Sequence, residues 1–161
     1  MSNIIDYVKE YGNLTMEEYP FNNVDSLILC QLAYLRFENS VLDVEGEVIE
    51  ITQFENQIER LTKDTRVPLQ NQDLFSCLIH SLRFSHIFIS NLSYNFDKTY
   101  EKQFCAITFH LSNQTDYIAF RGTDASFVGW KEDFNLSFQE NIPSQISALH
   151  YVDSYQTKHT L

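Results

Sequence analysis

The chain has 161 residues, of which 43% are hydrophobic and 14% aromatic, a size and composition that suit one folded domain with a core of its own. Lys and Arg number 11 against 22 Asp and Glu, so the formal net charge is −11. Charge of that sign repels phosphate backbones and the anionic inner leaflet of a membrane, and we therefore set aside nucleic-acid binding and docking to a membrane through basic residues.

The start of the chain and its cysteines bear on the cellular compartment. Residues 1–7 hold no basic region followed by an apolar run, so we expect no signal peptide. No apolar stretch approaches the roughly 20 residues that a membrane helix needs. Cys30, Cys77 and Cys105 are odd in number and widely spaced, which favours buried, reduced thiols. We predict a cytoplasmic protein without a transmembrane segment.

Helical patterns dominate residues 1–90. A short first helix is predicted over residues 4–11, where apolar side chains recur at helical spacing. Asn22 or Asn23 can cap the helix that follows, because a short polar side chain satisfies free amides at a helix start. Residues 25–37 are apolar on nearly every side, which predicts a central, buried helix.

The next two helices are predicted from their starts. Residues 41–51 are ambiguous and allow a short extended piece. Thr52 and Glu55 have the spacing of a capping box, so we expect a helix to begin there. Asn71 is the expected cap of a further helix, whose apolar side chains are Leu74, Phe75, Leu78, Ile79 and Leu82.

The pattern changes to extended structure after residue 86. Residues 104–111 alternate in polarity and predict a strand with one apolar face, formed by Cys105, Ile107, Phe109 and Leu111. Residues 112–115 are a polar connector of hairpin length. Residues 117–120 are uniformly apolar, as expected for a strand covered on both faces.

Two more elements are expected near the end of the sequence. Residues 134–138 are predicted to form one more short strand. Pro143 suits the first turn of a helix, because its missing N–H is unpaired there in any case. That helix would carry an apolar stripe formed by Ile146, Leu149 and Val152.

A candidate site follows directly from the strand of residues 117–120, which runs into Arg121, Gly122 and Thr123. Gly122 lets a ligand or another backbone come close, and Thr123 offers both an amide and a hydroxyl. Such donors stabilise negative charge that develops on a carbonyl oxygen. In open α/β sheets, ligands bind at the carboxyl ends of the strands. A plain turn with a hydrogen-bonded carboxylate is the structural alternative.

Two motifs in this stretch resemble the oxyanion-loop region of class 3 lipases, which are α/β-hydrolases. They are F-R-G-T at residues 120–123 and W-K-E-D at residues 130–133. The surrounding sequence looks most like a bacterial lipase-like family of unknown function, with P-F-N-N-V-D-S-L-I-L upstream and F-N-L-S-F downstream. The resemblance covers essentially the whole chain, but only the N-terminal part of the family's length.

The resemblance implies an α/β fold, namely an incomplete α/β-hydrolase in one domain over residues 1–161. Residues 1–90 would form a mainly helical support. Residues 104–161 would supply a β-hairpin and the first strands of the sheet, with the oxyanion loop. The C-terminal catalytic part would be absent. Full-length relatives would be serine hydrolases acting on small ester or acyl substrates, with no metal and no organic cofactor.

The resemblance also implies roles for single residues. Thr123 matches the position whose backbone amide forms one half of the oxyanion hole. Asp133 matches the carboxylate that hydrogen-bonds and orients the Thr123 hydroxyl. Arg121, Gly122 and Trp130 match positions of structural support, which hold the loop against the sheet.

The sequence departs from the family in its nucleophile. Family catalysis needs a Ser in G-x-S-x-G, but the glycines are Gly12, Gly46, Gly122 and Gly129, and no two of them are four positions apart. Losing a nucleophile costs on the order of 10⁶ in rate. We therefore predict that this chain has no nucleophile, is an N-terminal fragment of a serine hydrolase, and is inactive by itself.

The absent part bears on self-association and on the alternatives. In the resembled fold, the strand of residues 116–121 pairs with the nucleophile strand; without that partner its edge invites pairing with another chain, aggregation or cover by a helix. The alternative function is a non-catalytic, acidic cytoplasmic interaction module that has kept the scaffold. A third hypothesis is a helical regulatory protein that docks through its hairpin.

Histidine and cysteine positions give no second site. Cys77 and His80 have a metal-like spacing, but no second pair completes a tetrahedral set. Cys105 and His110 have the residue types of a nucleophile pair, yet strand alternation puts them on opposite faces. We therefore predict no metal site and no cofactor site.

Overall fold

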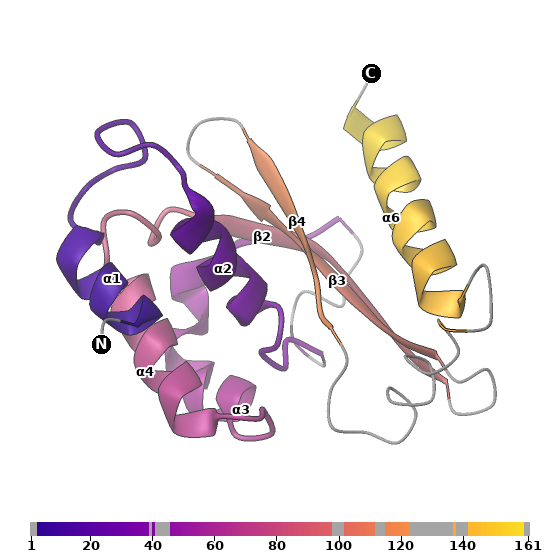
Figure 1. Ribbon diagram of the computed structural model, residues 1–161, viewed down its shortest axis with the longest axis horizontal. Helices are drawn as coiled ribbons and strands as arrows, with labels where there is room; N and C mark the ends of the chain where they lie inside the picture. The colour runs from indigo at the N-terminus through magenta and orange to yellow at the C-terminus, as the bar shows by residue number, and fades with distance from the viewer. Residues whose placement is uncertain are drawn as a thin grey trace. The chain divides into compact units, whose positions relative to one another are not determined.

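The computed structural model describes residues 3–38, 40, 46–97, 102–111, 115–122, 137 and 142–159, and of residues 97, 102 and 156–159 it describes the backbone alone. The strands form one open antiparallel sheet in the order β1-β2-β3-β4. The fold is therefore mixed α/β, as expected. In chain order (Figure 1) the elements are α1 (Ile4–Tyr11), α2 (Asn23–Leu32), β1 (Val48–Glu50), the 3-10 helix η2 (Ile51–Gln57), α3 (Ile58–Thr62), α4 (Pro68–Ile79), β2 (Phe88–Asp97), β3 (Lys102–His110), β4 (Asp116–Phe120) and α6 (Pro143–His159).

The chain groups into two compact units. The first comprises Met1–Leu92 and Ile107–Ala119, and the second comprises Ser93–Ala106 and Phe120–Leu161. Helices α1 to α4 and strand β1 belong to the first unit, where the four helices lie clustered together (Figure 1). Helix α6 belongs to the second unit, and strands β2, β3 and β4 contribute residues to both.

Asparagine capping boxes start the first two helices. The side chain of Asn3 accepts hydrogen bonds from amides at the start of α1, and Asp6 accepts from the Asn3 amide in return. Asn22 and Asp25 repeat this arrangement at α2. The predicted first helix and the Asn22 cap are thus confirmed, because both follow from side chains within one turn of each other.

Helix α2 is shorter than the predicted helix over residues 25–37. It ends at Leu32, and tight turn hydrogen bonds follow, such as the one from the Leu35 amide to the Leu32 carbonyl at 3.0 Å. The Arg36 amide instead donates to the Leu61 carbonyl at 2.9 Å. Leu35 and Phe37 are nevertheless buried in the core. An apolar run indicates that a segment is buried but does not by itself show that it is helical. Here the buried segment continues beyond the helix as a loop.

Two predicted helix starts are wrong. Thr52 and Glu55 lie inside η2, whose first residue has no side-chain cap, so the capping box does not form. Asn71 lies inside α4, which begins at Pro68 and so places a proline in its first turn. The Asn71 side chain is buried and binds Gln31 and Thr65, each at 2.8 Å. Tertiary partners outweigh the local capping preference at this position.

Each strand of the sheet is hydrogen-bonded to its neighbour in the strand order. Strand β1 is antiparallel to β2, with Val48 opposite Ser90 and Glu50 opposite Phe88. Strand β3 confirms the extended structure predicted for residues 104–111, but its burial differs. Residues 104–109 are all buried, so both faces are covered where alternation predicted one.

Strands β3 and β4 form the predicted hairpin. The Leu111 amide donates to the Thr115 carbonyl, and the Arg121 amide donates to the Cys105 carbonyl, both at 2.9 Å. These two bonds fit one antiparallel register, in which His110 lies opposite Asp116. The strand at residues 117–120 is confirmed, but its coverage on both faces is not, because Phe120 is 40% exposed.

Helix α6 begins at Pro143 as predicted, and it is anchored within the second unit by polar and aromatic contacts. The Ser144 hydroxyl donates to the Gln103 carbonyl at 2.9 Å, and the Tyr151 ring meets the Phe120 ring edge-on at 6.1 Å. The predicted apolar stripe faces outward in part, since Leu149 is 60% exposed. The predicted strand at residues 134–138 lies outside the described residues, apart from residue 137.

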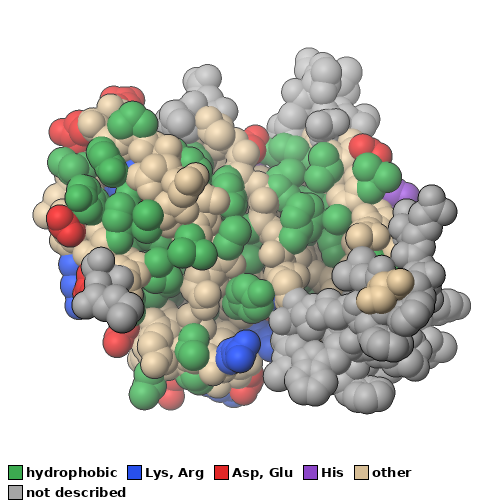
Figure 2. Space-filling model, in the orientation of Figure 1, with side chains coloured by type: hydrophobic (Ala, Val, Ile, Leu, Met, Phe, Trp, Pro, Cys, Tyr) green, Lys and Arg blue, Asp and Glu red, His purple; other side chains and the backbone are tan. Residues whose placement is uncertain are grey.

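Hydrophobic side chains on the surface are interspersed with polar ones. On the face drawn in Figure 2 they form separate groups among polar atoms. Folded proteins normally expose apolar atoms over much of their surface. Among the described residues, every helix is too short or too polar to cross a membrane.

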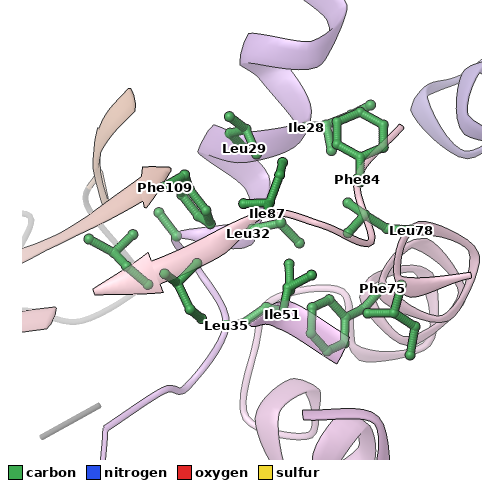
Figure 3. Packing of buried hydrophobic residues seen from close by; sticks show 14 of the residues in the cluster. Ile28, Leu29, Leu32, Leu35, Ile51, Phe75, Leu78, Phe84, Ile87 and Phe109 are labelled. Atoms are coloured by element: carbon green, nitrogen blue, oxygen red, sulfur yellow. The ribbon is translucent and has the colours of Figure 1, made fainter. Parts of the chain in front are cut away.

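The core of the first unit is formed by side chains that converge from α2, η2, α4 and the sheet (Figure 3). Leu82, predicted to continue the apolar face of α4, is 48% exposed, because α4 ends at Ile79 and the helical spacing no longer applies. Each fully buried side chain contributes roughly 1.5–3 kcal/mol. The labelled members are Ile28, Leu29, Leu32, Leu35, Ile51, Phe75, Leu78, Phe84, Ile87 and Phe109.

Candidate functional site

The predicted oxyanion site lies mostly outside the described residues. Thr123, Trp130 and Asp133 are not among them, so their assigned roles stay predictions. The structure describes Arg121 and Gly122, which follow directly after the end of β4. Gly122 is exposed, whereas Arg121 is buried.

Arg121 is held by its backbone and its guanidinium. Its amide completes the β3–β4 ladder at the Cys105 carbonyl. Its guanidinium lies over the ring of Tyr94, 5.9 Å from the centroid, and only 7% of the residue is exposed. A cation over an aromatic face is attracted to the ring. A guanidinium is more weakly hydrated than an ammonium group, so burying it costs less. Arg121 therefore has the packing that a supporting residue needs.

A second cluster joins three strands within the first unit. The Ser90 hydroxyl on β2 lies 2.8 Å from Nε2 of His110 on β3. Nδ1 of the same ring lies 2.6 Å from Oδ1 of Asp116 on β4. Val48 on β1 is the register partner of Ser90. A hydroxyl, an imidazole and a carboxylate thus stand in one row across the sheet, which we call the cross-strand row.

The donor and acceptor roles in the cross-strand row follow from chemistry. A carboxylate only accepts hydrogen bonds, so Nδ1 of His110 donates to Asp116, and in the neutral ring Nε2 then accepts from Ser90. This is the connectivity of a serine nucleophile, its base and its orienting acid. Ser90 is, however, only 3% exposed and lies within β2. The arrangement leaves little room for an acyl group at the hydroxyl.

Sequence reasoning considered His110 only as a partner for Cys105 and so missed the cross-strand row. The signal that was available is the hairpin: His110 precedes the connector and Asp116 follows it, so strand pairing places them opposite each other. The Ser90 contact needs the pairing of β2 with β3, for which the sequence gives no register.

A buried ion pair links α2 to the segment after α4. Nη2 and Nε of Arg83 donate to the two carboxylate oxygens of Asp25 at 2.5 and 2.7 Å, and both side chains are 0% exposed. Nη1 of Arg83 also donates to the Tyr19 carbonyl at 2.7 Å. The hydrogen bond to Asp25 raises the pKa of Arg83. Tyr7 donates to Asp25 from α1, and burial raises the pKa of its phenol.

Tyr117 anchors β4 to α2 on the other face of the strand. Its hydroxyl lies 2.6 Å from that of Ser26 and 3.2 Å from the Cys30 sulfur. Burial raises the pKa of Tyr117 above its ordinary value. The ring also packs against Phe21 at 5.7 Å between centroids. These contacts hold β4 against α2.

Metal ligation has no geometric support among the described residues, where no three His, Cys, Asp or Glu side chains gather around one point. His80, in the metal-like spacing with Cys77, binds the Ser76 carbonyl through Nδ1 at 2.8 Å. Its Nε2 lies 3.3 Å from Glu55, and the ring is 65% exposed.

Fold and site together define a mixed α/β protein in which an antiparallel hairpin leads into a buried arginine and an exposed glycine. The chain belongs to the Mbeg1-like family, a lipase-like family related to the α/β-hydrolases, whose match covers residues 78–160, just over half of the sequence. The lipase-like resemblance is thereby confirmed at the level of the family. No curated protein and no solved structure matches the chain.

Proposed function

We propose that this chain supplies the acyl-oxygen-binding part of a lipase-like serine hydrolase that acts on small ester or acyl substrates. The observation that supports this most is the end of β4, where the buried Arg121 and the exposed Gly122 continue the strand in a chain of a lipase-like family. A glycine at this place lets a substrate carbonyl approach the backbone closely.

Thr123 and Asp133 carry the chemistry in this proposal. The Thr123 amide donates to the oxygen of the tetrahedral intermediate, and Asp133 fixes the Thr123 hydroxyl so that the amide keeps its direction. Removing one such donor costs roughly 10²–10³ in rate. Arg121, Gly122 and Trp130 hold the loop, as their match to the family implies.

The chain by itself should not turn over esters. The second oxyanion donor in this fold is the amide after the nucleophile, and the sequence holds no G-x-S-x-G from which either would come. A rate loss on the order of 10⁶ for a missing nucleophile leaves no measurable turnover. We propose that the nucleophile, the base and the acid are supplied by sequence other than these 161 residues.

A fluorophosphonate probe and an ester assay test the proposal on this chain. We expect no labelled serine and no ester turnover above that of a heat-unfolded sample. The DNA that continues the frame after the codon for Leu161 supplies the second test, since a downstream G-x-S-x-G is expected there. In the protein from such a frame, Thr123→Ala or Asp133→Ala should lower kcat far more than the free energy of unfolding. Unchanged turnover would contradict the assigned roles.

A non-catalytic interaction module is the second candidate, and the strong acidity of the chain favours it. The same DNA separates the two functions: a stop without any G-x-S-x-G frame would favour the module. A neutral or cationic protein would then be the expected partner, because a net charge of −11 repels polyanions.

Self-association through β4 accompanies the first candidate. In the described sheet β4 stands at one end of the strand order, beyond β3. An edge strand of this kind pairs readily with another extended chain. Light scattering across a concentration series should show dimers or larger species. A monomer at high concentration would speak against pairing through this edge.

A further inference from the structure

The cross-strand row holds β4 from one face of the sheet. His110 reaches Ser90 at 2.8 Å through one nitrogen and Asp116 at 2.6 Å through the other, so a single ring ties β2 to β4 across β3. The ring is 22% exposed and the Asp116 side chain 34% exposed. Hydrogen bonds with a charged acceptor are shorter and stronger than neutral ones.

The next residue along β4 is held from the opposite face. Tyr117 is bound by Ser26 at 2.6 Å and by Cys30 at 3.2 Å, both from α2. Adjacent strand residues point to opposite faces, so Asp116 and Tyr117 can satisfy their partners only in one register. A slip of one residue would turn the Tyr117 phenol away from α2 and Asp116 away from His110.

We propose that His110 is a positioning residue that sets the register of β4 on β3. In that register the Arg121 amide meets the Cys105 carbonyl, and Gly122 is the second residue after the strand. The register fixes where the pairing of β4 with β3 ends and therefore where the oxyanion loop begins. This catalytic consequence rests on the proposed function, which the inference deepens. The hydrogen bonds themselves do not depend on that function.

The same three side chains have the residue types of a catalytic triad, and burial decides between the two roles. An acyl carbon must reach the Ser90 oxygen for attack, yet the residue is 3% exposed. Ser90 is also the register partner of Val48 on β1, so it lies within β2 and not at a strand-to-helix turn. Positioning is the role that these observations favour.

Amide hydrogen exchange measured residue by residue by NMR tests the proposal. In His110→Gln the amides that β4 and the following Arg121 donate to β3 should exchange roughly 10–100-fold faster, because two hydrogen bonds of ordinary strength are lost. His86→Gln is the matched control: His86 lies 3.5 Å from Glu50, but its ring is 68% exposed. It should leave β4 unchanged.

Register and tautomer provide readouts that a general loss of stability would not give. The Hα–Hα contact of Thr108 with Ile118 marks the native register, and we expect a second set of cross-strand contacts in His110→Gln. Ring nitrogen shifts should show Nδ1 protonated in the wild type, with Ser90→Ala altering only the Nε2 signal.

Three outcomes would overturn the positioning role. The first is β4 exchange in His110→Gln equal to that in His86→Gln, with one set of cross-strand contacts. The second is a His110 ring protonated at Nε2 alone. The third is fluorophosphonate labelling of Ser90, which would make the row a nucleophilic site. If His110→Gln does not fold, Asp116→Asn decides by the same measurements. None of them uses ester turnover, so failure of the proposed function is detected separately.

Discussion

Replacing Arg83 by methionine should be among the most destabilising single changes in this chain. The substitution keeps an unbranched apolar side chain but removes a guanidinium that donates to both oxygens of Asp25 and to the backbone carbonyls of Leu14, Thr15, Tyr19 and Pro20. The carboxylate that remains is 0% exposed, so bulk solvent does not reach it.

The magnitude follows from that burial. Removing one member of a buried ion pair costs about 3–5 kcal/mol, because the charge left behind is not compensated. Folded domains have about 5–15 kcal/mol of stability in total, so the variant should be marginally folded. For a protein of this size such a loss lowers Tm by roughly 6–20 °C. Because the pKa of Arg83 is raised, its side chain stays charged near neutral pH. The loss of stability in Arg83→Met should therefore not vary with pH in that range.

Urea unfolding followed by circular dichroism measures the loss. Arg36→Met is the matched control, since Arg36 lies 3.8 Å from Glu38 and 30% of its side chain is exposed. Such a pair is worth at most about 1 kcal/mol. The double variant Arg83→Met with Asp25→Leu should be more stable than the Arg83 variant alone. Equal losses for Arg83→Met and Arg36→Met, or a double variant at the sum of its singles, would refute the reasoning.

Two other predictions follow from burial. Leu78→Ala should cost about 2–5 kcal/mol because Leu78 is 0% exposed, whereas Leu82→Ala, at a residue 48% exposed, should stay within about 0.5 kcal/mol in the same urea assay; similar losses would contradict the core assignment. Burial raises the folded-state pKa of Tyr7 and Tyr117, so their contribution is complete below the unfolded value near 10 and is lost as pH rises above it. Stability measured by urea unfolding should therefore fall on the alkaline side of about pH 10, and Tyr7→Phe should weaken that fall.

Local chemistry explains which elements the sequence could predict. Asn22 and Asp25 sit within one turn of α2, so their mutual capping depends only on neighbours in sequence. The strand at residues 117–120 and the start of α6 at Pro143 are likewise local features. Each of these predictions needed no knowledge of what packs against the element.

The missed features depend on distant partners. Asp25 was predictable as part of a cap, but its pairing with Arg83 joins residues 58 apart in sequence. Asn71 has a side chain suited to a cap, yet Gln31 binds it in the interior of α4. A propensity states what a residue can do at a helix end, and the tertiary partner decides which of those options is used.

The cross-strand row shows the same principle for chemistry. Ser90, His110 and Asp116 have the bonding order of a nucleophilic triad, and a motif search reads only the residue types. A serine in such a row can act as a nucleophile only if an electrophile reaches its oxygen. That access depends on the surrounding sheet and not on the residue types. In this chain the candidate acyl-binding loop begins after the exposed Gly122, while the hydroxyl of the described cross-strand row belongs to Ser90, which is 3% exposed between β1 and β3. Residue types permit either role for the cross-strand row, and the burial of Ser90 favours positioning over nucleophilic attack.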